Sequence, residues 1–325
     1  MELLKKLSEA YGVSGDEGGI CALIRDEVKD FADDIYTDVM GNLVVHKRGE
    51  GKKVMYIAHT DEIGFTATHI DDNGFIRFGF VGNPDGHFLP FRRVIFKNGT
   101  VGTLAYEKNV SEIKDVNSSN MYIDIGAKDK REAENSVSVG DTACVLQPFS
   151  DFGAAVSGKA LGGRIGVYVL INALKSIKNN KNDLYFVFSS QKEVGQRGAK
   201  TAAFSIEPDY AVAIDFCETG DTPNCPVSDI SLGGGAAIKV KDASVIANKS
   251  VREALVLCAE KNNIPYQLEV SDNASTDAGA VHLTKSGIKT GAVCVPVRYA
   301  KTPCETAYKC DIESAVRLFE NLCFA

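Results

Sequence analysis

The sequence predicts an α/β protein with a small all-β insertion. Short, uninterrupted apolar runs, such as residues 184–188, are typical of strands that are buried on both faces of an α/β sheet. Segments with apolar residues at helical spacing separate these runs. Between residues 66 and 151 the helical spacing nearly disappears, and turn pairs such as Asn73 and Gly74 separate short strand-like segments. The insertion is therefore expected to differ in architecture from the rest of the chain.

The predicted elements alternate along the chain outside the insertion. Helical patterns at residues 3–10 and 20–31 precede strand-like runs at 35–37, 42–45 and 54–58. After the insertion, a helical pattern at 167–177 leads into the strand at 184–188, further strands are expected at 210–214 and 291–295, and a helix at 312–322 closes the chain. We therefore predict a discontinuous α/β domain of residues 1–65 and 152–325, with residues 66–151 forming an inserted β-barrel.

Composition limits the class of protein. The 325 residues are 44% hydrophobic and 24% charged, which suffices for a large buried core. The net charge of −7 comes without a Lys/Arg-rich run, so nucleic acid and anionic membranes are not expected as partners. No apolar stretch approaches the roughly 18 residues of a membrane span and no signal peptide is recognisable, so we predict a cytoplasmic location. The nine cysteines include no C-x-x-C pair, which argues against a cysteine zinc module.

Polar side chains follow several of the predicted buried strands. In an open α/β sheet the ligand site lies beyond the carboxyl ends of the strands. The residues at these ends are His59, Asp61, Lys192, Glu193, Asp215 and Lys301. Imidazole and carboxylate groups are the ligands expected for zinc, cobalt or manganese. A single aspartate after a strand more often caps a helix or forms a turn, but recurrence at several strand ends favours a site.

Six segments carry a family resemblance. They are A-H-T-D-E-I-G at 58–64, G-K-A-L-G-G-R-x-G at 158–166, S-Q-K-E-V-G-Q-R-G-A at 190–199, A-I-D followed by G-D-T-P at 213–223, T-D-A-G-A at 276–280 and R-Y-A-K-T-P-C-E at 298–305. In this order they resemble the dinuclear metallo-aminopeptidases of the glutamyl and tetrahedral type, formerly labelled endoglucanase or cellulase M. The resemblance covers essentially the whole chain, including the β insertion.

The resemblance implies a zinc-peptidase-like α/β sandwich domain and an inserted barrel used for dimerisation within a homo-oligomer. It also implies two divalent ions, zinc or cobalt, which polarise a peptide carbonyl and lower the pKa of a bridging water. Carried over by position, His59 matches a metal ligand that Asp61 orients. Asp215 matches a ligand of the first metal and Glu193 a ligand of the second.

Three positions depart from the family's pattern. Gly162 stands where the family has an aspartate that bridges both metals, Lys192 where it has the general-base glutamate, and Lys301 where it has a histidine ligand. In the family, the charges of four carboxylates balance those of two divalent ions. In this chain, the carboxylates of Glu193 and Asp215 would balance the ammonium groups of Lys192 and Lys301, so the net charge is zero in both cases. We therefore predict that the two lysines replace the metals and that no metal cofactor is bound. The alternative is that both lysines point to solvent.

Two further expectations concern the cleft. Gly162 and Gly163 precede a helix, so their N–H groups, with the nearby lysines, would favour an anion such as a peptide carboxylate or a phosphate. Arg298 and Tyr299 line the substrate cleft by resemblance, although their strand position would serve packing equally well.

The sequence therefore predicts a metallo-aminopeptidase-family protein that lacks ordinary dinuclear-metal peptidase activity. It would bind peptides and associate with itself through the β insertion, or assemble with an active paralogue. The alternative is an active aminopeptidase that releases N-terminal residues from peptides with an altered metal site, or with Lys192 as its base. Gly162, Lys192 and Lys301 discriminate between the two, because a dinuclear enzyme needs ligands that these residues do not supply.

Overall fold

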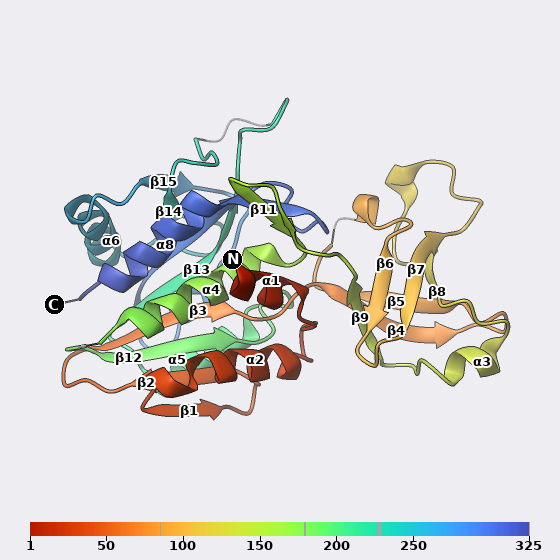
Figure 1. The fold of residues 1–325 in the computed structure, drawn as a ribbon, viewed down its shortest axis with the longest axis horizontal. Helices are drawn as coiled ribbons and strands as arrows, with labels where there is room; N and C mark the ends of the chain where they lie inside the picture. Colours follow the sequence, from red (N-terminus) through yellow and green to blue (C-terminus); the bar gives the residue numbers. More distant parts are fainter. Residues whose placement is uncertain (85, 179, 226–228, 325) are drawn as a thin grey trace.

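The chain folds into an α/β part that carries both termini and a β-barrel at one end of it (Figure 1). The structure is a computed structural model that describes residues 1–84, 86–178, 180–225 and 229–324. The six barrel strands lie in the sequence between β3 (Lys53–His59) and β10 (Ser150–Asp151). This is the inserted all-β architecture that the sequence predicts.

The α/β part is built on an eight-stranded mixed sheet. Four neighbouring strands, β12, β3, β13 and β16, run parallel, and the hairpin of β1 and β2 joins β12 in antiparallel orientation. At the other edge β14 is antiparallel to β16 and parallel to β15. In sheet order the strands are β1 (Asp34–Thr37), β2 (Leu43–Lys47), β12 (Asp183–Ser189), β3 (Lys53–His59), β13 (Tyr210–Glu218), β16 (Lys289–Val297), β14 (Ala236–Lys241) and β15 (Tyr266–Val270).

Helices cover both faces of this sheet, and the strands are apolar on both sides for that reason. Along β3, Val54, Tyr56 and Ala58 belong to one hydrophobic core, whereas Met55 and Ile57 belong to the other. The first core is closed by α1 (Glu2–Glu9), α2 (Gly18–Val28), α4 (Leu161–Ser176), α6 (Lys249–Lys261) and α8 (Lys309–Asn321), and the second by α5 (Arg197–Ile206) and α7 (Ala278–Val281). The predicted α/β sandwich is confirmed.

The barrel closes six antiparallel strands around its own core. Phe65, Phe78 and Phe96 are among the buried side chains that fill it. In barrel order the strands are β4 (Gly64–Ile70), β5 (Ile76–Val81), β8 (Met121–Asp124), β7 (Val101–Tyr106), β6 (Arg93–Phe96) and β9 (Thr142–Val145). Short helices lie between them: η2 (Gly86–Phe88), η3 (Ile113–Asp115) and α3 (Lys130–Glu134). The predicted β-barrel is confirmed, and the division of the chain at residues 66 and 151 stays a prediction.

The connection between the two parts starts at a strand end that carries predicted site residues. β3 ends at His59 and β4 begins at Gly64, so only residues 60–63 link the sheet to the barrel. The chain returns through a small sheet of β10 (Ser150–Asp151), β11 (Ala155–Gly158) and β17 (Glu305–Tyr308), and a turn of 3-10 helix, η1 (Lys29–Phe31), follows α2. Among the helices that the structure describes, none has the length and apolar character to cross a membrane.

Candidate functional site

The carboxyl ends of neighbouring parallel strands bring the predicted residues together. Ser189 of β12 is paired with His59 of β3, and Asp215 lies two residues beyond the last pair of β13 with β3. The loop after β12 carries Lys192 and Glu193. Since parallel strands end at the same edge of a sheet, side chains that are far apart in sequence meet there.

His59 is buried between two carboxylates. Its Nδ1 lies 3.2 Å from Asp61 Oδ1, its Nε2 lies 3.6 Å from Asp215 Oδ1, and the residue is 3% exposed. Burial and the Lys192 ammonium oppose protonation, but the two carboxylates outweigh them and raise the pKa of His59 to about 10. In return, against the effect of burial, His59 helps to lower the pKa of Asp61 to about 2. The two carboxylates therefore favour the protonated imidazole.

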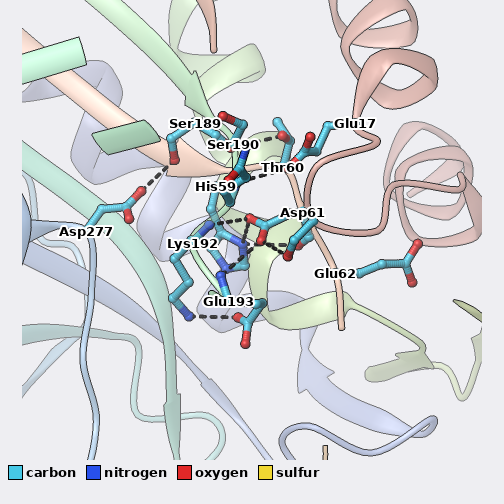
Figure 2. Close-up of polar contacts among 12 residues, drawn as sticks. Glu17, His59, Thr60, Asp61, Glu62, Ser189, Ser190, Lys192, Glu193 and Asp277 are labelled. Atoms are coloured by element: carbon cyan, nitrogen blue, oxygen red, sulfur yellow. Dashed lines mark hydrogen bonds and ion pairs between the residues drawn. The ribbon is translucent and has the colours of Figure 1, made fainter. Parts of the chain in front are cut away.

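The ammonium of Lys192 lies between Asp215 and a third carboxylate, that of Glu193. Its Nζ is 3.0 Å from Glu193 Oε1 and 3.3 Å from Asp215 Oδ2, and the side chain is 8% exposed. Figure 2 shows this side chain reaching toward Glu193. Burial disfavours the charge, but Asp215 and Glu193 raise the pKa of Lys192 above its usual range, and in spite of burial the ammonium lowers the pKa of Asp215. Lys192 thus contacts both carboxylates that are retained from the family's ligand positions, and its replacement of the metals stays a prediction.

Asp61 fixes the loop that carries Lys192. Its Oδ1 accepts the backbone N–H of Lys192 at 3.0 Å, and its Oδ2 accepts the N–H of Glu193 at 2.9 Å (Figure 2). Its Oδ2 also accepts the hydroxyl of Ser14 at 2.5 Å. Asp61 is 1% exposed, so these bonds are made without competition from water. Gln191, just before the loop, has a left-handed backbone with φ of 54°. One carboxylate thus holds both His59 and the backbone of the two following site residues.

An aromatic ring fills the space beside Gly162. A Cβ atom on Gly162 would lie 2.3 Å from Phe216 Cδ1, and Lys192 Nζ lies 5.2 Å from the centre of the same ring. An aspartate at residue 162 does not fit while Phe216 occupies this space. Gly163 is similarly constrained, because its Cβ would lie 2.4 Å from His59 Cε1. Phe216 was not assigned from the sequence. The available indications were a phenylalanine directly after Asp215 and a glycine at residue 162, where the family has an aspartate.

Lys301 does not share the arrangement of Lys192. Its side chain is exposed, and it forms no ion pair with any residue that the structure describes. Its backbone has a φ of 61° and its N–H donates to Glu305 Oε1 at 2.7 Å, which holds the loop in a left-handed turn. The expectation that both lysines neutralise the buried carboxylates is therefore wrong for Lys301, because this turn leaves its side chain at the mouth of the site.

Glu305 occupies the place where an anion was expected. Its Oε2 accepts the N–H of Gly162 at 2.9 Å, in the first turn of α4. An external phosphate or carboxylate on this N–H is excluded, because the carboxylate of the chain itself is already bound there. Burial, which outweighs these hydrogen bonds, raises the pKa of Glu305 to about 7.

A further buried carboxylate lies behind His59 and was not assigned from the sequence. Asp277 Oδ2 accepts the hydroxyl of Ser189 at 2.6 Å, and its Oδ1 has no partner among the described residues. Burial raises the pKa of Asp277 to about 6. Only the T-D-A-G-A segment pointed to this residue, and that signal did not indicate a role.

Arg298 and Tyr299 lie beside the His59 pocket instead of lining it. Arg298 forms a two-pronged ion pair with Asp221 at 2.8 and 2.7 Å, and Tyr299 is 56% exposed. Both line a neighbouring hollow that shares Thr302 and Pro303 with the pocket around His59. Their expected role in a substrate cleft stays a prediction.

Comparison with known proteins places this arrangement in a family. The profile of the M42 glutamyl aminopeptidase family matches residues 41–318. A putative aminopeptidase of Acetivibrio thermocellus is 48% identical over 323 residues, which are 99% of this chain and 98% of that protein. The chain belongs to the M42 glutamyl aminopeptidase family.

Solved structures agree with this assignment of the M42 protein. The aminopeptidase APDkam598 from Desulfurococcus kamchatkensis superimposes with a TM-score of 0.95 at 35% identity, covering 98% of this chain and 93% of that one. The TET1 peptidase of Pyrococcus horikoshii, which can assemble into a tetrahedron or a large octahedral shell, superimposes with a TM-score of 0.90 at 36% identity, covering 99% and 98%. The family resemblance and the fold expected from the sequence are confirmed.

The residues of this M42 protein do not fit the pair of divalent ions that the resemblance implies. Within the described ranges, no three His, Cys, Asp or Glu side chains converge in a way that could hold a metal. The Lys192 ammonium lies between Glu193 and Asp215, and Phe216 excludes a side chain at residue 162. A divalent ion about 4 Å from an ammonium would be repelled by about 8 kcal/mol at an effective dielectric of about 20.

Proposed function

We propose that this M42 protein is a peptide-binding member of its family that has lost metal-dependent aminopeptidase activity. The position of Lys192 carries the proposal. Its ammonium makes contacts of 3.0 and 3.3 Å with the carboxylates that would otherwise bind cations. A peptidase of this type needs a water activated by metal and a carboxylate base, and neither a bridging carboxylate nor a base carboxylate stands at residues 162 and 192.

The charged groups around Asp215 support the same conclusion, with His59 in the place that was expected for Lys301. Lys192 contacts Asp215 and Glu193, and His59 lies between Asp61 and Asp215, so two basic groups meet three carboxylates. The charge of Asp61 is stabilised by backbone N–H groups and a hydroxyl as well as by His59. His59, and not Lys301, is thus the second basic group at these carboxylates, and each basic group is already engaged by two of them.

Metal content and turnover test this proposal together. We expect the purified protein to hold well under one zinc, cobalt or manganese per chain by plasma mass spectrometry. We also expect no turnover of a panel of aminoacyl-nitroanilides with any of these ions added. Near-stoichiometric metal together with metal-dependent release of nitroaniline would overturn the proposal in favour of an active aminopeptidase with an altered metal site.

We further propose that the protein forms a homo-oligomer in the cytoplasm through its β-barrel. The assembly of the TET1 peptidase and the exposed apolar side chains Phe91 and Val139 of the barrel part, 69% and 65% exposed, support this. Light scattering is expected to show an oligomer that Phe91→Glu with Val139→Glu weakens. A monomeric wild-type protein would refute it, and co-purification with an active paralogue would show the mixed form of the same assembly.

A further inference from the structure

A mostly apolar pocket opens next to the Lys192 centre. It is partly open to solvent, and Glu193 and Phe216, which both contact Lys192, are among the residues that line it. Its apolar wall comes from both parts of the molecule: Ile63, Leu89, Val145, Phe216 and Pro303. A ligand that fills this pocket therefore needs an apolar body.

Each acidic group in the pocket wall already has a positive or N–H partner. Glu62 accepts two hydrogen bonds from Lys159 Nζ, at 2.7 and 2.6 Å. Glu193 is paired with Lys192, and Asp61 with His59. Glu305 accepts backbone N–H groups on both of its oxygens. These carboxylates are therefore poor partners for a cationic ligand, because each would have to exchange an existing contact.

Lys301 is a charged side chain of the pocket lining that lacks a partner of opposite charge among the described residues. It lines the mouth and is exposed. Below the wall, Arg164 is fully buried, shares the single carboxylate of Glu62 with Lys159, and leaves its Nε and Nη1 without partners. The backbone that carries Lys301 is held by Glu305 in a left-handed conformation, and Tyr299 two residues earlier also has a positive φ, of 59°. Strained backbone of this kind concentrates at functional sites.

We propose that this pocket binds a ligand with an apolar body and a single carboxylate, with Lys301 as the residue that holds the carboxylate. The C-terminal residue of a peptide and a free N-acylated apolar amino acid share this chemistry. A ligand that presents a free ammonium group is disfavoured, because Lys301 and Lys192 would repel it and the carboxylates are already engaged. The inference rests on the proposed function, because it requires the pocket to be free of a bound pair of metal ions.

Matched probes test the sign of the preferred charge. N-acetyl-leucine carries the carboxylate without an ammonium, and leucinamide carries the ammonium without a carboxylate. By titration calorimetry on the full-length protein we expect binding of N-acetyl-leucine at least about tenfold tighter than binding of leucinamide, which corresponds to about 1.4 kcal/mol. An acetylated tripeptide ending in leucine distinguishes a peptide C-terminus from a free N-acylated amino acid as the natural ligand. Binding of either this tripeptide or N-acetyl-leucine more tightly than leucinamide supports the proposal.

Variants test the role of Lys301 itself. Lys301→Met is expected to weaken N-acetyl-leucine at least about tenfold, and Lys301→Arg to retain most of the affinity. Lys200→Met, which removes an exposed lysine on α5 outside the pocket, is the matched control and should leave affinity unchanged. Tighter binding of leucinamide, no binding of any carboxylate probe, or a Lys301→Met protein with wild-type affinity would overturn the proposal. If these binding experiments fail and the protein is metal-free and inactive, only the carboxylate-binding proposal is refuted, and the proposed function is unaffected. Stoichiometric metal would instead refute the proposed function, on which the binding proposal rests.

Discussion

Among the residues that the structure describes, Lys239 and Lys192 are each buried between a pair of carboxylates, but their surroundings differ. Lys239 Nζ lies 2.6 Å from Glu269 Oε1 and 3.7 Å from Asp242 Oδ2, with its side chain 0% exposed. Lys192 makes a similar pair of contacts, at 3.0 and 3.3 Å. The chemistry of the two centres is almost the same, so chemistry alone does not distinguish them.

Their places in the sheet make the difference. Lys239 lies within β14, directly paired with Glu269 of β15, and neither residue borders a described pocket. Lys192 lies beyond the end of β12, and its partner Glu193 lines the pocket next to Phe216. The ion pair of Lys239 and Glu269 connects two paired strands inside the sheet. The ion pair of Lys192 and Glu193 stands at the strand ends, where ligands bind in α/β sheets.

The largest loss of stability is expected from breaking the fully buried centre of Lys239, Glu269 and Asp242. Lys239→Ala would leave Glu269 and Asp242 buried without their cation, and we expect a loss of about 3–5 kcal/mol in the free energy of unfolding, measured by urea denaturation. Lys239→Met combined with Glu269→Leu should recover most of this loss, because the unpaired charge is removed together with its partner. Equal losses in the single and double variants would mean that the unpaired buried charge is not the cause of the loss.

Chemical rescue should separate the two centres. Lys192→Ala is expected to destabilise the protein by a similar amount, about 3 kcal/mol, because Asp215 and Glu193 lose their ammonium. Ethylammonium should restore part of the melting temperature of Lys192→Ala, because the vacated space adjoins an open pocket and bound ligand stabilises the folded state. Lys239→Ala should not respond, since its centre is sealed. Identical responses of the two variants would remove the distinction drawn between them.

Phe216 should decide whether a metal centre can be rebuilt. We expect the triple variant Gly162→Asp, Lys192→Glu, Lys301→His to remain without metal, because the Phe216 ring occupies the space of the restored aspartate. Adding Phe216→Ala should allow zinc to bind, with stabilisation of about 2.7 kcal/mol at a zinc concentration of about 100 times Kd. The melting temperature with and without zinc measures this directly. A zinc response of the triple variant alone would show that Phe216 is no barrier.

The two centres should respond to pH with opposite sign. Although burial opposes ionisation, His59 and hydrogen bonds lower the pKa of Asp61 from 3.8 to about 2, so its contribution to stability is present above pH about 4 and is lost as pH falls through about 2. That contribution is about 2 kcal/mol. Burial outweighs Lys239 and raises the pKa of Glu269, so its contribution is complete below pH about 4.5 and is lost as pH rises through the folded-state value.

Denaturation across pH checks these signs. Asp61→Asn should flatten the acid limb of the stability curve, and Glu269→Gln should flatten the decline on the higher-pH side. Curves of Asp61→Asn and wild type that remain parallel between pH about 4 and 2 would contradict the assignment of the acid limb to Asp61.

The sequence predicted the sheet, the barrel and the meeting of residues at the strand ends because these follow from local patterns. Apolar runs specify buried strands, and the residues after them share one edge, so His59, Glu193 and Asp215 could be brought together without coordinates. The sequence could not show that Phe216 fills the space beside Gly162, because that contact depends on the packing of side chains from α4 and β13. It also could not separate Lys192 from Lys301, because only the backbone conformation decides which of them turns inward.

The smallest change in stability is expected for Lys301, in comparison with Lys192. Lys301→Met should change the free energy of unfolding by no more than about 0.5 kcal/mol, although residue 301 stands at a metal-ligand position of the family. The reason is that its side chain is exposed and unpaired in the described structure, so no buried charge is left without a partner. Lys192→Met is the matched variant and should be several-fold more destabilising in the same urea titration. A loss for Lys301→Met as large as that for Lys192→Met would mean that both ammonium groups neutralise the buried carboxylates, and that the pocket mouth is not where Lys301 acts.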